Sequence, residues 1–257
     1  MNSRRYAPCA LAAIIPVMFT GVRAYGQIAN GQPAFEVASI KSAAGGRGNF
    51  VHGGPGTNDP VFYRCERCEL RVLIMQAYNV NNFQLVRPSW METAIFDVVA
   101  RVPDGTTKEQ YRLMLQNLLA ERFKLSLHRD KKEVQMYDLV VAKGGPKLKE
   151  SVEGQGQGDA ALSGRPMIPD DWQFIRGTKQ TTEFLAARLA GHLQAPVTDS
   201  TGLRGAYDYT LSWSDNPDSG LSLFSAIQAT LGLKLKPKKG LLDIIVVDHA
   251  ERVPTEN

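Results

Sequence analysis

The fold class follows first from residues 96–102, FDVVARV, in which every second residue from Phe96 onward is apolar. A period of two residues is typical of a β-strand with one buried face. Residues 207–213, YDYTLSW, show the same period. Both stretches begin with an aromatic residue followed by aspartate, Phe96-Asp97 and Tyr207-Asp208. We therefore predict two strands that occupy corresponding places in the chain.

Helical patterns flank the first of these strands. Apolar residues recur at helical spacing before it and after it, and Thr106 or Thr107 can cap the second helix. The elements predicted in this half are a strand at 35–40, a mobile loop at 42–60, helices at 70–78 and 111–119 around the strand at 96–102, and strands at 123–127 and 137–142 joined through the polar stretch 129–133.

The same order recurs around the second strand. The predicted elements are a helix at 184–193, the strand at 207–213, a helix at 224–231 ended by Gly232, a strand at 233–235, a turn at 236–240 and a last strand at 242–247. Phe123-Lys124-Leu125 also matches Leu233-Lys234-Leu235. These matches indicate an internal repeat. Chance similarity between two amphipathic segments is the alternative.

We predict an α+β fold of two similar helix and strand units with small, mostly antiparallel sheets. Residues 27–148 form the first unit, with its N-terminal strand and glycine-rich loop, and residues 181–257 form the second. Residues 149–180 join them as a flexible linker, since residues 149–164 are rich in glycine, glutamine, serine and aspartate and offer little apolar surface for packing.

Residues 1–26 have the pattern of a cleavable signal peptide. Arg4 and Arg5 precede a short apolar run, residues 7–20, and small residues follow it. The run is shorter than a membrane-spanning helix requires, and Pro16 interrupts it. An uncleaved anchor is the alternative. We expect an exported protein, periplasmic or extracellular, with no membrane span after signal removal.

The mature chain is almost neutral. Of 30 basic residues, Arg4, Arg5 and Arg23 lie in the signal, which leaves 27 against 26 acidic residues. A neutral chain lacks the positive field that attracts phosphates. Nucleic acid is therefore not an expected partner.

Cys65 and Cys68 are the sharpest local motif. They are the only cysteines after the signal, and they stand just before the helix predicted at 70–78. A thiolate at a helix N-terminus is stabilised by the helix dipole, which suits a redox pair. In an oxidising compartment the two residues are also expected to form a structural disulfide. Zinc would need a second pair of ligands, and none is near.

Other polar residues are weaker candidates for a functional site. His52, His128, His192 and His249 are scattered, so no metal or cofactor is expected. Asp97 and Asp208 could form a coupled carboxylate pair, or each could accept a backbone hydrogen bond at its strand. The loop 199–205 is a tight connection that could also contact a partner. Its candidate interaction residues are Asp199, Thr201, Gly202, Arg204 and Gly205.

Several motifs resemble one family. They are residues 35–41 (FEVASIK), 118–125 (LLAERFKL), 140–148 (VVAKGGPKL), 196–208 (PVTDSTGLRGAYD), 231–235 (LGLKL) and 246–251 (VVDHAE). Together they resemble the soil-associated exported family that is expanded in acidobacteria, a domain of unknown function. Each unit is also similar, more weakly, to the short N-terminal domain of secretins and TonB-dependent receptors. The resemblances imply an exported protein with an extracytoplasmic sensing or interaction role.

We therefore expect a noncatalytic extracytoplasmic binding or protein-interaction module, with an envelope protein or a small ligand as partner. The alternative is an extracytoplasmic enzyme, either a thiol oxidoreductase that uses Cys65 and Cys68 or a hydrolase with a site assembled from scattered residues. The sequence itself contains no converging set of catalytic residues that would favour the second hypothesis.

Overall fold

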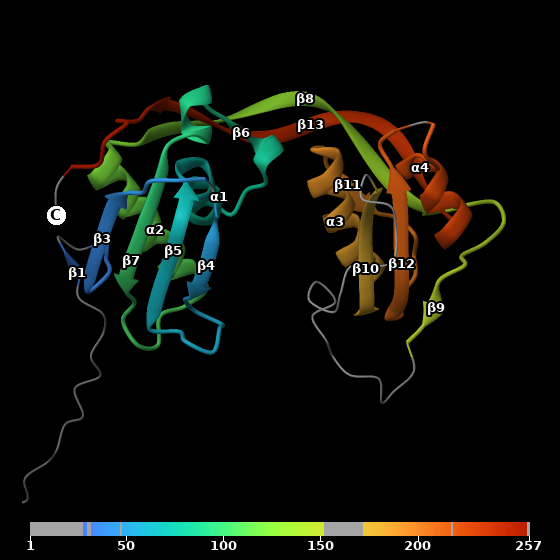
Figure 1. Ribbon diagram of the computed structural model, residues 1–257, viewed down its shortest axis with the longest axis horizontal. Helices are drawn as coiled ribbons and strands as arrows, with labels where there is room; N and C mark the ends of the chain where they lie inside the picture. The colour runs from blue at the N-terminus through green and yellow to red at the C-terminus, as the bar shows by residue number, and fades with distance from the viewer. Residues whose placement is uncertain (1–27, 30–31, 47, 152–171, 217, 256–257) are drawn as a thin grey trace, which may run out of the picture.

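A computed structural model describes residues 28–29, 32–46, 48–151, 172–216 and 218–255. It contains helices and several small, mostly antiparallel sheets, which confirms the predicted α+β class. Two lobes are joined along one side by a long two-stranded ribbon (Figure 1). The predicted signal peptide, residues 1–26, lies outside the described residues.

The first lobe is a four-stranded antiparallel sheet with two helices. Its strands are β3 (Val37–Ser42), β4 (Phe50–Gly53), β5 (Phe62–Glu69) and β7 (Ile95–Arg101), in the order β3-β7-β5-β4. Its helices are α1 (Leu70–Tyr78) and α2 (Lys108–Phe123), and a small hairpin of β1 (Ile28–Ala29) and β2 (Gln32–Pro33) precedes the sheet. Thr107 caps α2 by accepting the N–H of Gln110, as the sequence predicted for Thr106 or Thr107.

The second lobe has a smaller sheet and two helical segments. Its strands are β9 (Lys149–Glu150), β10 (Trp172–Gln180) and β12 (Tyr207–Ser214), in the order β10-β12-β9. Its helices are α3 (Thr182–Leu193) and α4 (Leu223–Ala226), which continues as a π-helical turn, Ile227–Leu231. Gly232 ends this helix with a φ of +64°, as the sequence predicted, and a side chain there would collide with the carbonyl oxygen of Gly145.

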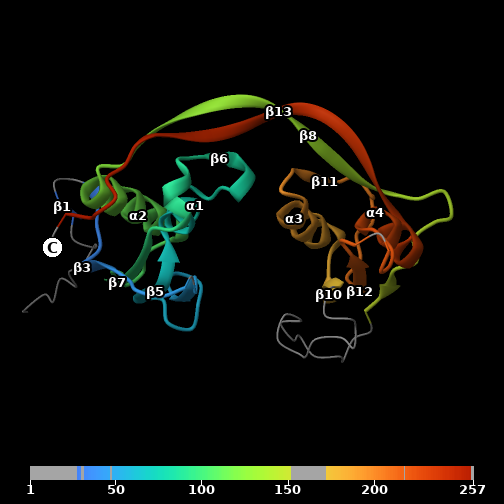
Figure 2. The same cartoon turned by 45° about the horizontal axis from the view of Figure 1, so that its top comes forward.

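The ribbon that joins the lobes is made of β8 (Ser126–Val141) and β13 (Leu233–His249), which pair antiparallel along their length. Strand β8 leaves the first lobe and ends in the second, and β13 runs the opposite way (Figure 2). Two short strands add to the ribbon in parallel, β6 (Leu85–Val86) to β13 and β11 (Val197–Asp199) to β8. Each lobe is therefore completed by a strand from the other half of the chain.

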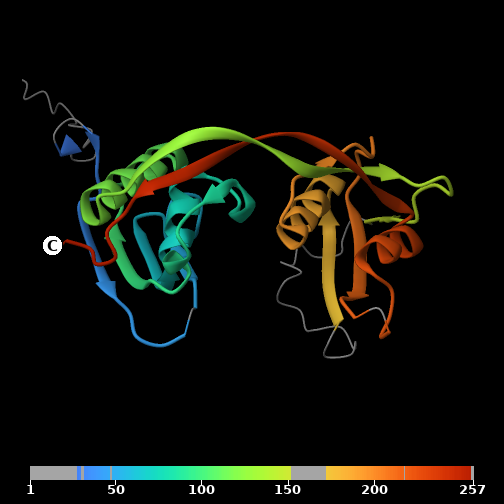
Figure 3. The same cartoon turned by 90° about the horizontal axis from the view of Figure 1, so that it is seen from above.

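The strand exchange corrects two sequence predictions. The polar stretch 129–133 and the expected turn 236–240 are not turns, because each lies within one continuous strand. Their residues pair with those of the opposite strand, for example Lys239 with Gln135. Most side chains of this middle segment are exposed, and Figure 3 shows it running between the lobes. A two-stranded ribbon without a covering layer needs polar residues on both faces, so its composition imitates a turn.

Two further expectations were wrong in detail. The loop expected at 42–60 contains β4, in which Phe50 and Val51 are each a little under half exposed and no residue is buried. The strand therefore leaves no alternating pattern in the sequence. The expected linker, residues 149–180, has strands at its described ends, β9 and β10. From Phe174 to Thr178, strand β10 alternates partly and fully buried residues, and this short stretch was included in the predicted linker because a glycine-rich segment precedes it.

Each lobe has its own hydrophobic core, and the exchanged strands take part in both. Ile245 and Val247 of β13 are buried in the core of the first lobe. Leu139 of β8 is buried in the core of the second. Burying one such aliphatic side chain stabilises a fold by about 2 kcal/mol. The halves of the chain therefore depend on each other for their cores.

Candidate binding site between the lobes

Asp97 and Asp208 lie in different sheets, so they do not form a carboxylate pair. Asp97 Oδ1 accepts the N–H of Arg67, and Asp208 Oδ1 accepts the N–H of Lys179, both at 2.8 Å. Arg67 and Lys179 have φ values of +49° and +51° and lie where the register of β5 and β10 shifts. Each aspartate thus holds a β-bulge, which is the structural alternative that the sequence left open.

Cys65 and Cys68 are joined by a disulfide that spans the bulge of β5. They lie near the end of that strand, which stops at Glu69 directly before α1, so they precede this helix as predicted. Both residues are fully buried. A substrate thiol must reach a disulfide sulfur in order to exchange with it. The position therefore suits a structural link and does not favour the oxidoreductase hypothesis.

The four histidines stay apart. His128 Nδ1 lies 2.8 Å from Asp248 Oδ1 on the exposed ribbon. His192 packs edge-on against Trp213 in the second lobe, with ring centroids 4.6 Å apart. His52 is exposed on β4, and His249 is exposed at the end of β13. Among the described residues, no group of three histidine, cysteine, aspartate or glutamate side chains could hold a metal ion.

The predicted interaction loop, residues 199–205, turns its polar groups inward. Asp199 Oδ2 accepts the hydroxyl of buried Thr182 at 2.6 Å, and Asp199 Oδ1 accepts the N–H of Thr201. Thr201 Oγ1 then accepts the N–H of Leu203. Gly202 supplies the left-handed turn with a φ of +71°. Arg204 is exposed, while Gly205 packs beside the ring of Tyr207.

Two adjoining pockets lie where the two lobes face each other. A short helix of the first lobe, η1 (Asn82–Gln84), stands opposite the C-terminal end of α3. Between them is a pocket of about 430 Å³, hereafter the arginine pocket. It is lined by Arg71, Met75, Asn81, Asn82, Phe83, Arg87, Glu92, Gly191 and Gln194.

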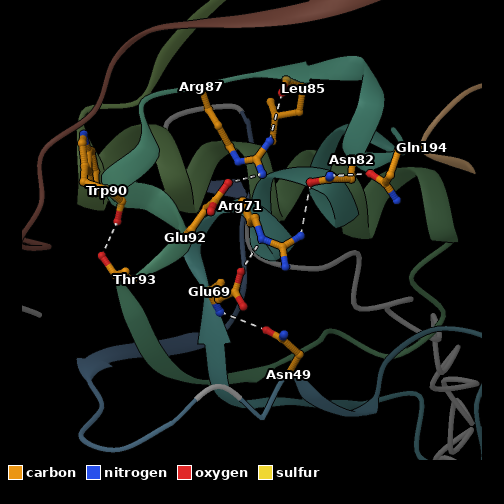
Figure 4. Close-up of polar contacts among 10 residues, drawn as sticks. All are labelled: Asn49, Glu69, Arg71, Asn82, Leu85, Arg87, Trp90, Glu92, Thr93 and Gln194. Atoms are coloured by element: carbon orange, nitrogen blue, oxygen red, sulfur yellow. Dashed lines mark hydrogen bonds and ion pairs between the residues drawn. The ribbon is translucent and has the colours of Figure 1, made fainter. Parts of the chain in front are cut away.

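A chain of polar contacts crosses this pocket from one lobe to the other (Figure 4). It begins at the fully buried Glu69, which accepts a hydrogen bond from Arg71 Nε. Arg71 Nη1 donates to Asn82 Oδ1 at 3.2 Å. Asn82 Nδ2 donates to Gln194 Oε1 of the second lobe at 2.6 Å. The guanidinium of Arg71 is thereby fixed in the pocket wall.

Arg87 supplies a second guanidinium. It is placed by β6 and the short helix η2 (Ser89–Glu92), where its Nη1 and Nη2 donate to the carbonyl of Leu85 and the carboxylate of Glu92, both at 3.1 Å. Its Nε is buried and has no acceptor in the described part of the chain. Burial of Arg87, followed by the positive charge of Arg71, lowers its pKa. The pocket thus concentrates positive charge with unused donors.

A second pocket, of about 590 Å³, adjoins the first. Asn81 and Phe83 line both. The rest of its wall comes from η1, α3, the residues around β11, and Leu242 of the ribbon. We call it the α3 pocket; its lining is Asn81, Phe83, Gln84, Glu183, Ala186, Ala187, Ala190, Pro196, Val197, Thr198, Asp199 and Leu242.

Sequence reasoning missed this site except for Asp199. Arg71 lies outside the apolar stripe of α1, so the helical pattern gives it no role. Arg87 and Asn82 lie in short 3-10 and loop segments that carry no periodic signal. Gln194 comes from the other lobe. Only the exchange of strands between the halves brings these residues together.

The fold and the site define a two-lobed α+β protein whose lobes share a ribbon of exchanged strands and line two open pockets between them. Residues 71–250 match the family described as "Protein of unknown function (DUF3738)", and the chain belongs to this family. The match confirms the predicted domain of unknown function, and it includes every residue that lines the two pockets. No curated protein and no solved structure matches the chain. Within the described residues, no helix is long and apolar enough to cross a membrane.

Proposed function

We propose that this chain is an exported, noncatalytic binding protein that holds a small ligand between its two lobes. The observation that carries the proposal is the pair of adjoining pockets, each lined by residues of both lobes. Their volumes are in the range of about 300–1,000 Å³ that is usual for small-molecule sites. A ligand seated there contacts η1 from one side and α3 from the other, which makes its binding sensitive to the position of both lobes.

Export is supported by the N-terminal sequence and by the family resemblance. The order of positive residues, short apolar run and small residues in 1–26 is that of a cleavable signal. The disulfide between Cys65 and Cys68 suits an oxidising compartment. We therefore place the mature protein in the periplasm or outside the cell.

An internal duplication explains how the site is built. The elements β5, α1, β6, β7, α2 and β8 recur in order as β10, α3, β11, β12, α4 and β13. The bulges held by Asp97 and Asp208 occupy the same place in the two series. On this view the units exchange their last strands, and the pockets form at the junction that the exchange creates. The weaker likeness to secretin-type domains is consistent with such units.

A substitution that fills the arginine pocket tests the proposal. Gly191 lies on α3 in the pocket wall, and a Cβ there would meet no atom within 4 Å. Gly191→Trp should therefore fold and occupy the pocket. Gly144→Trp is the matched control, because Gly144 is exposed on a turn and its added Cβ is equally free.

Both variants and the wild-type mature chain are equilibrated with a small-molecule extract of the producing cells, and retained compounds are identified by mass spectrometry. We expect the wild type and Gly144→Trp to retain the same compound and Gly191→Trp to lose it. Retention that is equal in all three proteins, or absent from all three, would overturn the proposal.

A further inference from the structure

We propose that the ligand of this site is a short peptide with a free C-terminal carboxylate, which Arg71 and Arg87 bind. The inference rests on the proposed function and names its ligand class. It follows from three features of the described residues: unused donors in the arginine pocket, the opposite charge of the α3 pocket, and a strand edge in the wall of the latter.

The arginine pocket is built for a singly charged anion. Arg71 and Arg87 make four hydrogen bonds to described residues, which leaves most of their N–H donors without an acceptor. Carboxylates and phosphates both match the planar fork of a guanidinium. Of the two carboxylates that pair with these arginines, only Glu92 lines the pocket, so its lining has one net positive charge. A monoanionic carboxylate balances that charge, whereas a dianionic phosphate exceeds it. A carboxylate can accept hydrogen bonds from the N–H groups of both guanidinium groups that line the pocket.

The α3 pocket has the opposite character. Its charged lining residues are Glu183 and Asp199, and no basic residue lines it. Asp199 is occupied by Thr182 and Thr201, whereas Glu183 is exposed. Ala186, Ala187 and Leu242 supply apolar surface beside it. A molecule that spans both pockets would place its anionic end at the arginines, an apolar side chain against α3, and an amino group near Glu183.

A peptide main chain fits the wall between the pockets. Strand β11 is the end strand of the ribbon sheet and pairs with β8 on one side. End strands present backbone N–H and C=O groups to an added strand, which is a common mode of peptide recognition. Pro196 to Asp199 line the α3 pocket, and Asn81 and Phe83 continue into the arginine pocket. The peptide therefore runs from β11 toward Arg71 and Arg87.

The probes are a library of tripeptides with free C-terminal carboxylates and the same library with C-terminal amides. Each is equilibrated with the mature protein, and the retained peptides are quantified by mass spectrometry. We expect free acids to be retained about ten-fold or more above their amides, as for the loss of a charge-assisted contact. This comparison needs no variant, so it stands even where a substitution impairs folding.

The variant Arg87→Gln provides a second test. Glu92, which pairs with Arg87, is half exposed, so solvent can hydrate its carboxylate when the arginine is removed. Arg71 is left intact, because its guanidinium is hydrogen-bonded to the buried carboxylate of Glu69. Arg112→Gln is the matched control, because Arg112 contacts Asn79 and Glu109 and lines neither pocket. Arg87→Gln should remove the preference for free acids, and Arg112→Gln should preserve it.

Three results would overturn the inference in distinguishable ways. Equal retention of acids and amides would reject the carboxylate while leaving peptide binding in place. Competition by inorganic phosphate but not by acetate would reassign the arginines to phosphate. Failure to retain any tripeptide, with a cell-derived compound still lost in Gly191→Trp, would reject the peptide and leave the proposed function standing.

Discussion

Removing the disulfide of the first lobe should destabilise that lobe by an amount that the loop size sets. Cys65 and Cys68 are three residues apart, so the link closes a loop of about four residues. The chain-entropy relation for such a loop gives about 2 kcal/mol at 25 °C. The second lobe is an internal reference, because Gly177 and Gln180 bound its corresponding bulge without a covalent link.

We compare the double variant Cys65→Ala/Cys68→Ala with the single variant Cys65→Ala and with the wild type. The single variant already loses the covalent link, so we expect it to lose about 2 kcal/mol by urea unfolding. The second substitution should add less than the first, since it removes only one more buried sulfur. For a chain of this size the loss corresponds to a fall of about 4–8 °C in Tm.

Amide hydrogen exchange shows where the loss falls. Peptides from α1, which follows the disulfide directly, should lose protection, and peptides from α3 should keep it. Unchanged stability in both variants would refute the structural role, because the Asp97 contact alone would then hold the bulge. An equal loss of amide protection in α1 and α3 would refute the expectation that the disulfide stabilises only the first lobe. It would show that the exchanged strands make both lobes unfold together.

Two other predictions concern acid stability and export. Hydrogen bonds from Ser151 and from the backbone of Lys179 lower the pKa of Asp208, so its stabilising effect is present above the unfolded pKa, near 4, and is lost as pH falls through the lower folded value. Urea unfolding between pH 5 and pH 2 should show a smaller acid loss in Asp208→Asn than in the wild type, and parallel curves would contradict this. Residues 1–26 fused to a reporter that is active only outside the cytoplasm should give activity that Arg4→Glu/Arg5→Glu lowers, whereas activity equal to a leaderless reporter would reject the signal peptide.

The sequence predicted individual elements well and their connections poorly. Helices α1, α2 and α3 and strands β7 and β12 each bury one face, and burial of one face leaves a periodic pattern. The middle of β8 and β13 buries no face, so it left no such pattern. Local composition then suggested turns, and two hairpins were predicted where two strands instead cross between lobes.

The contrast between local patterns and long-range connections also explains why the sequence did not predict the site. Asp97, Asp208 and the two cysteines stood out because they lie in recognisable local motifs, yet they hold bulges. Arg71 and Gln194 have no local signature, since Arg71 lies outside the apolar stripe of α1 and Gln194 ends α3. Their meeting depends on long-range topology, which periodicity does not encode.

Strand exchange also determines what the site requires. Strand β6 follows η1 and is held on β13, whereas β11 follows α3 and is held on β8. Because β8 and β13 pair with each other, the ribbon fixes η1 and α3 on opposite sides of the pockets. Neither half of the chain holds both walls. The proposed ligand site therefore forms only when both halves of the chain fold, and we expect its affinity to depend on the stiffness of the uncovered ribbon between residues 129 and 136.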